Sequence, residues 1–171
     1  MLLSIREMEL HKIHFETTFP PGKIEFQDPK LRQVTPLETR GTAELIEATE
    51  EIRVKGHLNV TMATECDRCL EDAAFPIDQD FDLFYRPAVI EGGSHELPID
   101  EGESEMGFYE GSGLELTDLI CEQVLLALPM QRTCREDCRG ICPNCGQDRN
   151  RAQCACQPRP TDDRWAALRD L

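Results

Sequence analysis

The chain lacks any stretch suited to crossing a membrane. It contains no run of about 18 apolar residues. Its N-terminus turns charged at Arg6 without a long apolar segment, which argues against a secretory signal. Nine cysteines without an export signal indicate a reducing compartment, where thiols bind metal more often than they form disulfides. We therefore expect a cytoplasmic protein, with no membrane partner.

Basic residues are scarce, which excludes a protein that binds phosphates over its whole surface. The chain has 33 acids against 18 Lys and Arg residues, a net charge of −15, and residues 87–131 contain no Lys or Arg at all. Contact with nucleic acid must therefore be local or pass through a basic protein partner. The candidates for a local contact with RNA phosphates are four arginines near the C-terminus, which can equally be solvated side chains that offset thiolate charge. They are Arg135, Arg139, Arg149 and Arg151.

Motifs for catalysis are also missing. The sequence has no phosphate loop, no GxSxG, no HExxH and no glycine-rich dinucleotide turn. All four histidines lie outside the cysteine-rich C-terminal part, so a histidine-ligated catalytic zinc is not indicated. We expect no catalytic residues, no enzyme and no small-molecule substrate.

Hydrophobic periodicity predicts an α+β fold, an antiparallel β-sheet meander covered by one main helix. Alternating residues indicate strands at 42–48, 52–64 and 73–85, with a first strand within 2–19 and a short one at 106–109. The helix is expected to begin after an N-cap at Thr117 and to stop at Pro129. We expect a sheet-and-helix core over 1–131 and a small zinc-binding tail over 132–171 that ends in a short helix at 162–171.

Six cysteines fall between residues 134 and 156, and Cys66-Asp-Arg-Cys69 supplies an earlier pair. The ninth, Cys121, lies in the expected helix and is interpreted as a core residue. The remaining eight form four close pairs, enough for two tetrahedral zinc sites of four thiolates each. The candidate ligands are Cys66, Cys69, Cys134, Cys138, Cys142, Cys145, Cys154 and Cys156.

The pairing that we favour closes 142/145 with 154/156 locally and joins 66/69 to 134/138 in a second site. In other arrangements, four of the six tail cysteines hold a single zinc and leave 66/69 free, or an iron–sulfur cluster takes four cysteines. A thiol redox protein that uses Cys66 and Cys69 is the alternative function. That pair lacks the strand-to-helix setting which lowers the pKa of a thioredoxin-type thiol.

Three stretches of the sequence carry a family resemblance: VTMATECDRCLEDAAF at 60–75, the helix end LLALP at 125–129, and the tail Cys-x3-Cys-x-Gly-x-Cys-Pro-x-Cys-Gly with its closing Cys-x-Cys. Together they resemble the bacterial YceD family, also called the large ribosomal RNA subunit accumulation protein. The ending DRWAAL resembles the branch that carries a zinc-binding tail. The resemblance implies a role in ribosome biogenesis, with large-subunit ribosomal RNA, a large-subunit ribosomal protein, or both as partners, and it carries over no catalytic residue.

The cysteine pattern predicts a non-catalytic, zinc-stabilised protein, and the resemblance implies that it supports large-subunit ribosomal RNA accumulation or processing. It would act by holding a ribosomal protein or pre-ribosomal RNA. The protein's acidity favours a basic protein partner, because residues 91–118 can complement a Lys/Arg-rich chain.

Overall fold

The computed structural model describes residues 1–88 and 106–157. The chain forms two compact units, one of residues 1–64 and 74–130 and the other of residues 65–73 and 131–171. Most of the expected acidic stretch and the helix expected at 162–171 lie outside the described residues. The domain boundary expected between residues 131 and 132 stays a prediction.

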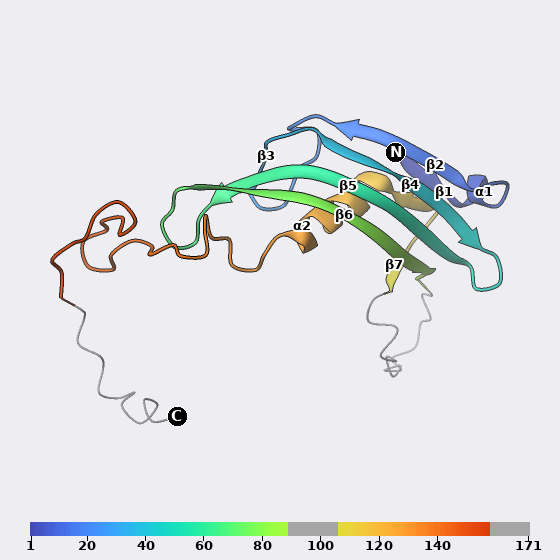
Figure 1. The fold of residues 1–171 in the computed structure, drawn as a ribbon. Helices are drawn as coiled ribbons and strands as arrows, with labels where there is room; N and C mark the ends of the chain where they lie inside the picture. The colour runs from blue at the N-terminus through green and yellow to red at the C-terminus, as the bar shows by residue number, and fades with distance from the viewer. Residues whose placement is uncertain (89–105, 158–171) are drawn as a thin grey trace, which may run out of the picture. The chain divides into compact units, whose positions relative to one another are not determined.

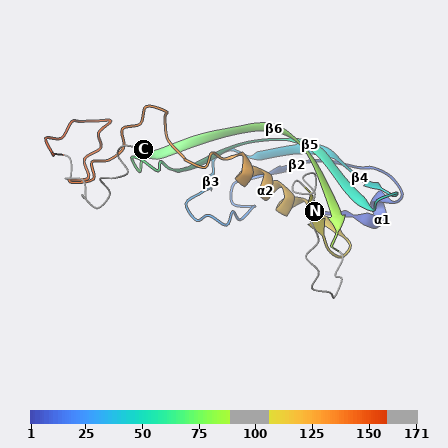
Figure 2. The same ribbon diagram turned by 90° about the horizontal axis from the view of Figure 1, so that it is seen from below.

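The first unit is a curved β-sheet with one main helix along one face (Figures 1 and 2), which confirms the α+β class. Neighbouring strands follow the order β2-β4-β5-β6-β7, and β3 pairs with the C-terminal part of β5. The strands are β2 Ile13–Phe19, β3 Arg32–Gln33, β4 Leu37–Ile46, β5 Glu51–Glu65, β6 Asp72–Pro87 and β7 Gly107–Tyr109. The last pair, β6 with β7, is parallel, so the sheet is mixed and not a pure antiparallel meander.

The helix α2, Leu116–Ala127, begins two residues earlier than expected, and its N-cap is Glu115, whose side chain makes no capping hydrogen bond. The helix ends where Leu128 takes an extended conformation with φ −72° and ψ 140°. A residue that precedes proline is disfavoured in the helical region, so Pro129 accounts for this end. The buried side chains of Leu119, Ile120 and Val124 join the sheet's core.

The first strand expected within 2–19 is β2, Ile13–Phe19, but the short elements β1, α1 and β8 were not predicted. β1, Leu2–Ser4, pairs antiparallel with β8, Gly113–Glu115, and α1 spans Ile5–Met8 between β1 and β2. The segments are too short to show a periodic pattern, because three residues cannot distinguish a strand from a loop. Pairing β1 with β8 holds the chain's start beside the beginning of α2.

Strand β4 begins at Leu37, five residues before the expected start, because Gly41 and buried Thr39 interrupt the apolar alternation. The Thr39 hydroxyl donates to the His57 carbonyl oxygen at 3.1 Å, which satisfies this buried polar group. Gly41 lies directly opposite Gly56 on β5. A Cβ atom on Gly41 would lie 2.7 Å from the ring of Phe15, and one on Gly56 would lie 2.7 Å from the ring of Phe81. The two rings thus occupy the space that side chains at these positions would need.

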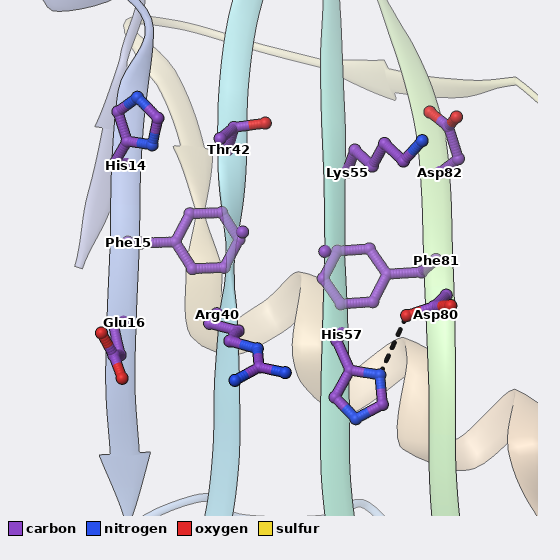
Figure 3. Close-up of a pocket in the computed structure, with 12 residues that line it drawn as sticks. His14, Phe15, Glu16, Arg40, Thr42, Lys55, His57, Asp80, Phe81 and Asp82 are labelled. Atoms are coloured by element: carbon purple, nitrogen blue, oxygen red, sulfur yellow. Dashed lines mark hydrogen bonds and ion pairs between the residues drawn. The ribbon is translucent and has the colours of Figure 1, made fainter.

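The opposite face of the sheet is charged and solvent-exposed (Figure 3). Acids and bases from neighbouring strands pair with one another on it, as in Arg53 with Asp82 at 2.6 Å and His57 with Asp80 at 2.9 Å. The hydrogen bond from Arg53 lowers the pKa of Asp82, despite the opposing effect of burial. The aspartates of β6 therefore lie on the solvent-exposed face of the sheet, as their alternation with apolar residues predicts.

No helix among the described residues is long and apolar enough to span a membrane.

Candidate metal centres

The second unit brings the 66/69 pair next to the 134/138 pair. Cys66 and Cys69 lie in the turn that follows β5, where the Cys66 N–H donates to the Glu71 carbonyl at 2.8 Å and the Leu70 N–H donates to the Cys66 carbonyl at 2.9 Å. Leu70 adopts a positive φ of 63° to close this turn. The turn points both sulfurs the same way, as a metal-binding knuckle requires.

Residues 132–138 are held to this turn by one backbone hydrogen bond and two that involve side chains of the turn. The Asp67 N–H donates to the Arg132 carbonyl at 2.8 Å, and the Arg132 N–H donates to the Asp67 carboxylate at 2.6 Å. The Arg68 guanidinium donates to the Cys138 carbonyl at 3.2 Å. These hydrogen bonds hold the 66–69 turn and residues 132–138 side by side. They therefore keep the four sulfurs together without any contact between the sulfurs themselves.

The spacing of the four sulfurs fits a single tetrahedral ion. Sγ of Cys66 lies 3.9 Å from Sγ of Cys138, and Sγ of Cys69 lies 3.7 Å from Sγ of Cys134. All four lie within 4.8 Å of one another. Ligands about 2.3 Å from a central zinc at tetrahedral angles would be about 3.8 Å apart, whereas a disulfide bond is about 2.05 Å long. The first cluster, Cys66, Cys69, Cys134 and Cys138, can therefore hold a metal ion.

The electrostatics of the first cluster also favour a cation. Burial raises the pKa of the Cys66 thiol, but backbone N–H groups, chiefly that of Cys134 at 3.3 Å, outweigh burial and lower the pKa to about 6. Burial and the neighbouring sulfurs of Cys69, Cys138 and Cys66 raise the pKa of Cys134 to about 12. A positive ion is what allows all four to ionise together.

The second cluster comprises Cys142, Cys145, Cys154 and Cys156, whose sulfurs also lie within 4.8 Å of one another. The Cys142 N–H donates to the Gln147 carbonyl at 2.8 Å, and the Gly146 N–H donates to the Cys142 carbonyl at 2.9 Å. Gly146 has a φ of 73°, which permits this tight turn. Hydrogen bonds from the Asn144 and Cys145 N–H groups lower the pKa of Cys142 to about 6. This cluster closes within 15 residues of chain.

Residues 139–141 connect the two clusters along the chain. The Ile141 N–H donates to the Arg68 carbonyl at 2.9 Å, and a Cβ atom on Gly140 would lie 2.7 Å from the same oxygen. Asn150 accepts a hydrogen bond from the Arg139 N–H at 2.8 Å and donates to Sγ of Cys138 at 3.5 Å. Asn150 thus reaches from the second cluster's loop to a sulfur of the first.

The sequence analysis missed Asn150, because an asparagine in a loop carries no ligand signature. Cys121 lies in neither cluster; it packs in α2 against the core, and burial raises its pKa. No histidine of the described residues belongs to either cluster. That the eight clustered cysteines are metal ligands stays a prediction, although the structure groups them in the two sets favoured above.

The structure divides the four candidate arginines into two kinds. Arg135 donates to the Asn150 side chain at 3.0 Å and Arg151 to Glu71 at 2.7 Å, so both are engaged within the protein. Arg139 and Arg149 line a hollow of about 560 Å³ beside the second cluster, and none of the described residues that line this hollow is acidic. Their guanidinium groups make no hydrogen bond or ion pair with another described residue.

Chemically, each cluster is a closed set of four thiols. A metal ion bound by all four would keep no open position for substrate, and four thiolates make a weakly electrophilic ion. Such sites usually stabilise a fold. The arrangement also brings the 66/69 pair into a set of four, where a metal ion would compete with disulfide chemistry.

Comparison with known proteins identifies relatives over most of the chain. The family described as large ribosomal RNA subunit accumulation protein YceD matches residues 54–171. The Bacillus subtilis protein YlbN is 21% identical over 171 residues, covering 99% of this chain and 94% of its own length. The Mycobacterium tuberculosis protein Rv2926c is 27% identical over 168 residues, covering 95% of this chain and 73% of its own length. No solved structure gives a significant match.

Proposed function

The chain belongs to the YceD family of large ribosomal RNA subunit accumulation proteins, and on that premise we propose that it is a non-catalytic, zinc-stabilised factor of ribosome biogenesis. It acts in the cytoplasm and supports the accumulation or processing of large-subunit ribosomal RNA. It does so by holding a ribosomal protein, pre-ribosomal RNA, or both.

One observation supports a zinc ion over an iron–sulfur cluster at each site. The four sulfurs of each cluster lie within 4.8 Å of one another. That spread suits thiolates around one ion. In an iron–sulfur cluster the thiolates bind different irons, which spreads them further apart. Soft thiolates in a tetrahedral set are typical ligands of zinc. The proposed ligands are therefore the four cysteines of each cluster, one ion to each.

A non-catalytic role is supported by the ligand set. Zinc enzymes usually keep three protein ligands and an open position, whereas each cluster here offers four thiols. The alternative, a redox protein that uses Cys66 and Cys69, predicts turnover of disulfide substrates that persists with zinc bound. We propose instead that both thiols are occupied as ligands, so that the metal-loaded protein has no such turnover.

Charge decides which partner is favoured. A net charge of −15 repels RNA at long range and attracts basic proteins. Ribosomal proteins that bind ribosomal RNA carry many Lys and Arg residues, as phosphate binding requires. The protein partner is therefore the principal one in this proposal. RNA contact is local, at Arg139 and Arg149, whose guanidinium groups line the hollow beside the second cluster.

Genetic complementation tests the function. Deletion of the gene should lower the ratio of large- to small-subunit ribosomal RNA, and the full-length chain should restore it. A chain with Cys66→Ser and Cys142→Ser should fold poorly in the second unit and fail to restore it. An unchanged ratio on deletion would contradict the proposed role, whatever metal the protein binds.

A further inference from the structure

The outward side of α2 carries an unusual ridge. Asp118, Glu122 and Leu126 lie at i, i+4 and i+8, so they share one stripe of the helix. All three are exposed, and Leu126 leaves 71% of its surface to solvent. Met130, three residues beyond the helix's last residue, is fully exposed. Two acids at i and i+4 repel each other, and exposed apolar side chains gain nothing from burial, so this stripe does not stabilise the helix.

A hollow flanks the ridge on each side. One, of about 650 Å³, lies between α2 and residues 23–27, with Ile24 and Leu125 in its walls. The other, of about 500 Å³, lies between α2 and the β6–β7 edge, with Tyr85 and Met106 in its walls. Leu126 and Glu122 line both hollows, so the two hollows meet at the ridge, and we call them together the α2 groove. Apolar side chains such as Ile24, Leu125 and Tyr85 and acidic side chains both line it.

The charge of this groove is one-sided. Of the described residues that line it, Asp118, Glu122 and Glu25 are acidic and Lys23 is basic. Asp82 also lines the second hollow, but it is paired with Arg53 at 2.6 Å. Neither Asp118 nor Glu122 forms an ion pair with a described residue. Glu122 and Tyr85 both line the second hollow, where burial, together with the charge of Glu122, raises the pKa of Tyr85 to about 12. Residues 87–131 contain no Lys or Arg that could compensate these acids.

We propose that this groove binds a lysine- and arginine-rich amphipathic segment of a large-subunit ribosomal protein. The inference rests on the proposed function and places that partner on named residues. Apolar side chains of the segment fill the two hollows around Leu126, and its cations pair with Asp118, Glu122 and Glu25. The acids that line the groove repel RNA phosphates, and they also repel a second copy of this acidic chain.

Site-specific photo-crosslinking of the full chain in cells tests the location. A benzophenone amino acid replaces Leu126 in one strain and Leu10 in another, where Leu10 is 83% exposed and lines neither hollow. Position 126 should crosslink to a Lys/Arg-rich large-subunit ribosomal protein identified by mass spectrometry, and position 10 should not. Adducts at position 126 with RNA, with a second copy, with residues 158–171 of the same chain or with a non-ribosomal protein would overturn the inference, as would no adduct.

Binding of the crosslinked ribosomal protein, purified, then tests the chemistry. Leu126→Gln should weaken affinity about tenfold, because it removes a central apolar anchor, and Leu10→Gln should change it by less than about twofold. The pair Asp118→Lys and Glu122→Lys should weaken binding more than Glu16→Lys and Glu38→Lys, which change net charge equally on the outer sheet face. Equal effects of the two double variants would overturn the groove and leave only long-range attraction.

The same strains separate the two levels of the proposal. If deletion of the gene lowers large-subunit ribosomal RNA but position 126 yields no ribosomal adduct, the groove inference falls and the proposed function stands. If deletion leaves ribosomal RNA unchanged, the proposed function itself falls.

Discussion

Replacing Asn150 tests whether a residue outside the cysteine set tunes the first metal site. Its side chain accepts hydrogen bonds from the Arg139 N–H at 2.8 Å and the Arg135 guanidinium at 3.0 Å. It donates to Sγ of Cys138 at 3.5 Å and to the Asp148 carboxylate at 2.8 Å. Asn150→Ala removes all four. Loss of such outer contacts costs about 10- to 100-fold in metal affinity, which corresponds to about 1.4 to 2.8 kcal/mol.

Asn150→Asp separates the contributions. The aspartate keeps oxygens that can accept from Arg139 and Arg135, but it replaces the donor to Cys138 with a negative oxygen next to a thiolate. We expect it to weaken zinc at least as much as alanine does, because like charges at this distance repel.

The assay is competition for zinc with a chromogenic chelator, carried out in a Cys142→Ser background so that only the first cluster binds. Asn144→Ala is the matched control, since the Asn144 side chain donates only to the Gln157 carbonyl among described residues, at 2.7 Å. Zinc affinity in Asn150→Ala equal to that of the parent, or equally weakened in Asn144→Ala, would refute the reasoning.

Two further predictions concern the sheet and the tail. Gly56→Ala should lower the free energy of unfolding by about 1–3 kcal/mol in urea melts, because its Cβ would lie 2.6 Å from a backbone oxygen of β4; an unchanged midpoint would contradict the packing described. The pair Arg139→Gln and Arg149→Gln should weaken binding of a fluorescent single-stranded RNA 12-mer and reduce its log–log salt slope by about 1.4. Arg135→Gln with Arg151→Gln should do neither, and equal losses from both pairs would rule out a local site at the hollow.

Periodic segments and ligand spacing account for most of what could be predicted. The alternation in β5 and β6 and the stripe in α2 reflect burial on one face, so their sequences record their structure directly. Cys142 and Cys145 form a local turn that their spacing encodes. The grouping of 66/69 with 134/138 was favoured because eight cysteines divide into two fours.

Other features depend on contacts that no local pattern records. β1 and β8 are three residues each and exist because they pair with each other. β7 pairs parallel to β6, which only the path of the chain decides. Asn150 reaches a sulfur of the first cluster because the fold of the tail places it there. From the sequence alone, the acidic ridge of α2 cannot be distinguished from an ordinary solvent-exposed helix face. The hollows beside it are formed by residues from other parts of the chain.

Counting metal ions by native mass spectrometry tests the central claim most directly, that eight thiols form two closed, independent zinc sites. The wild-type chain should carry two zinc ions, Cys66→Ser one, Cys142→Ser one, and Cys121→Ser two. A single ion in the wild type, a mass that includes iron and sulfide, or loss of both ions on Cys66→Ser would contradict the account.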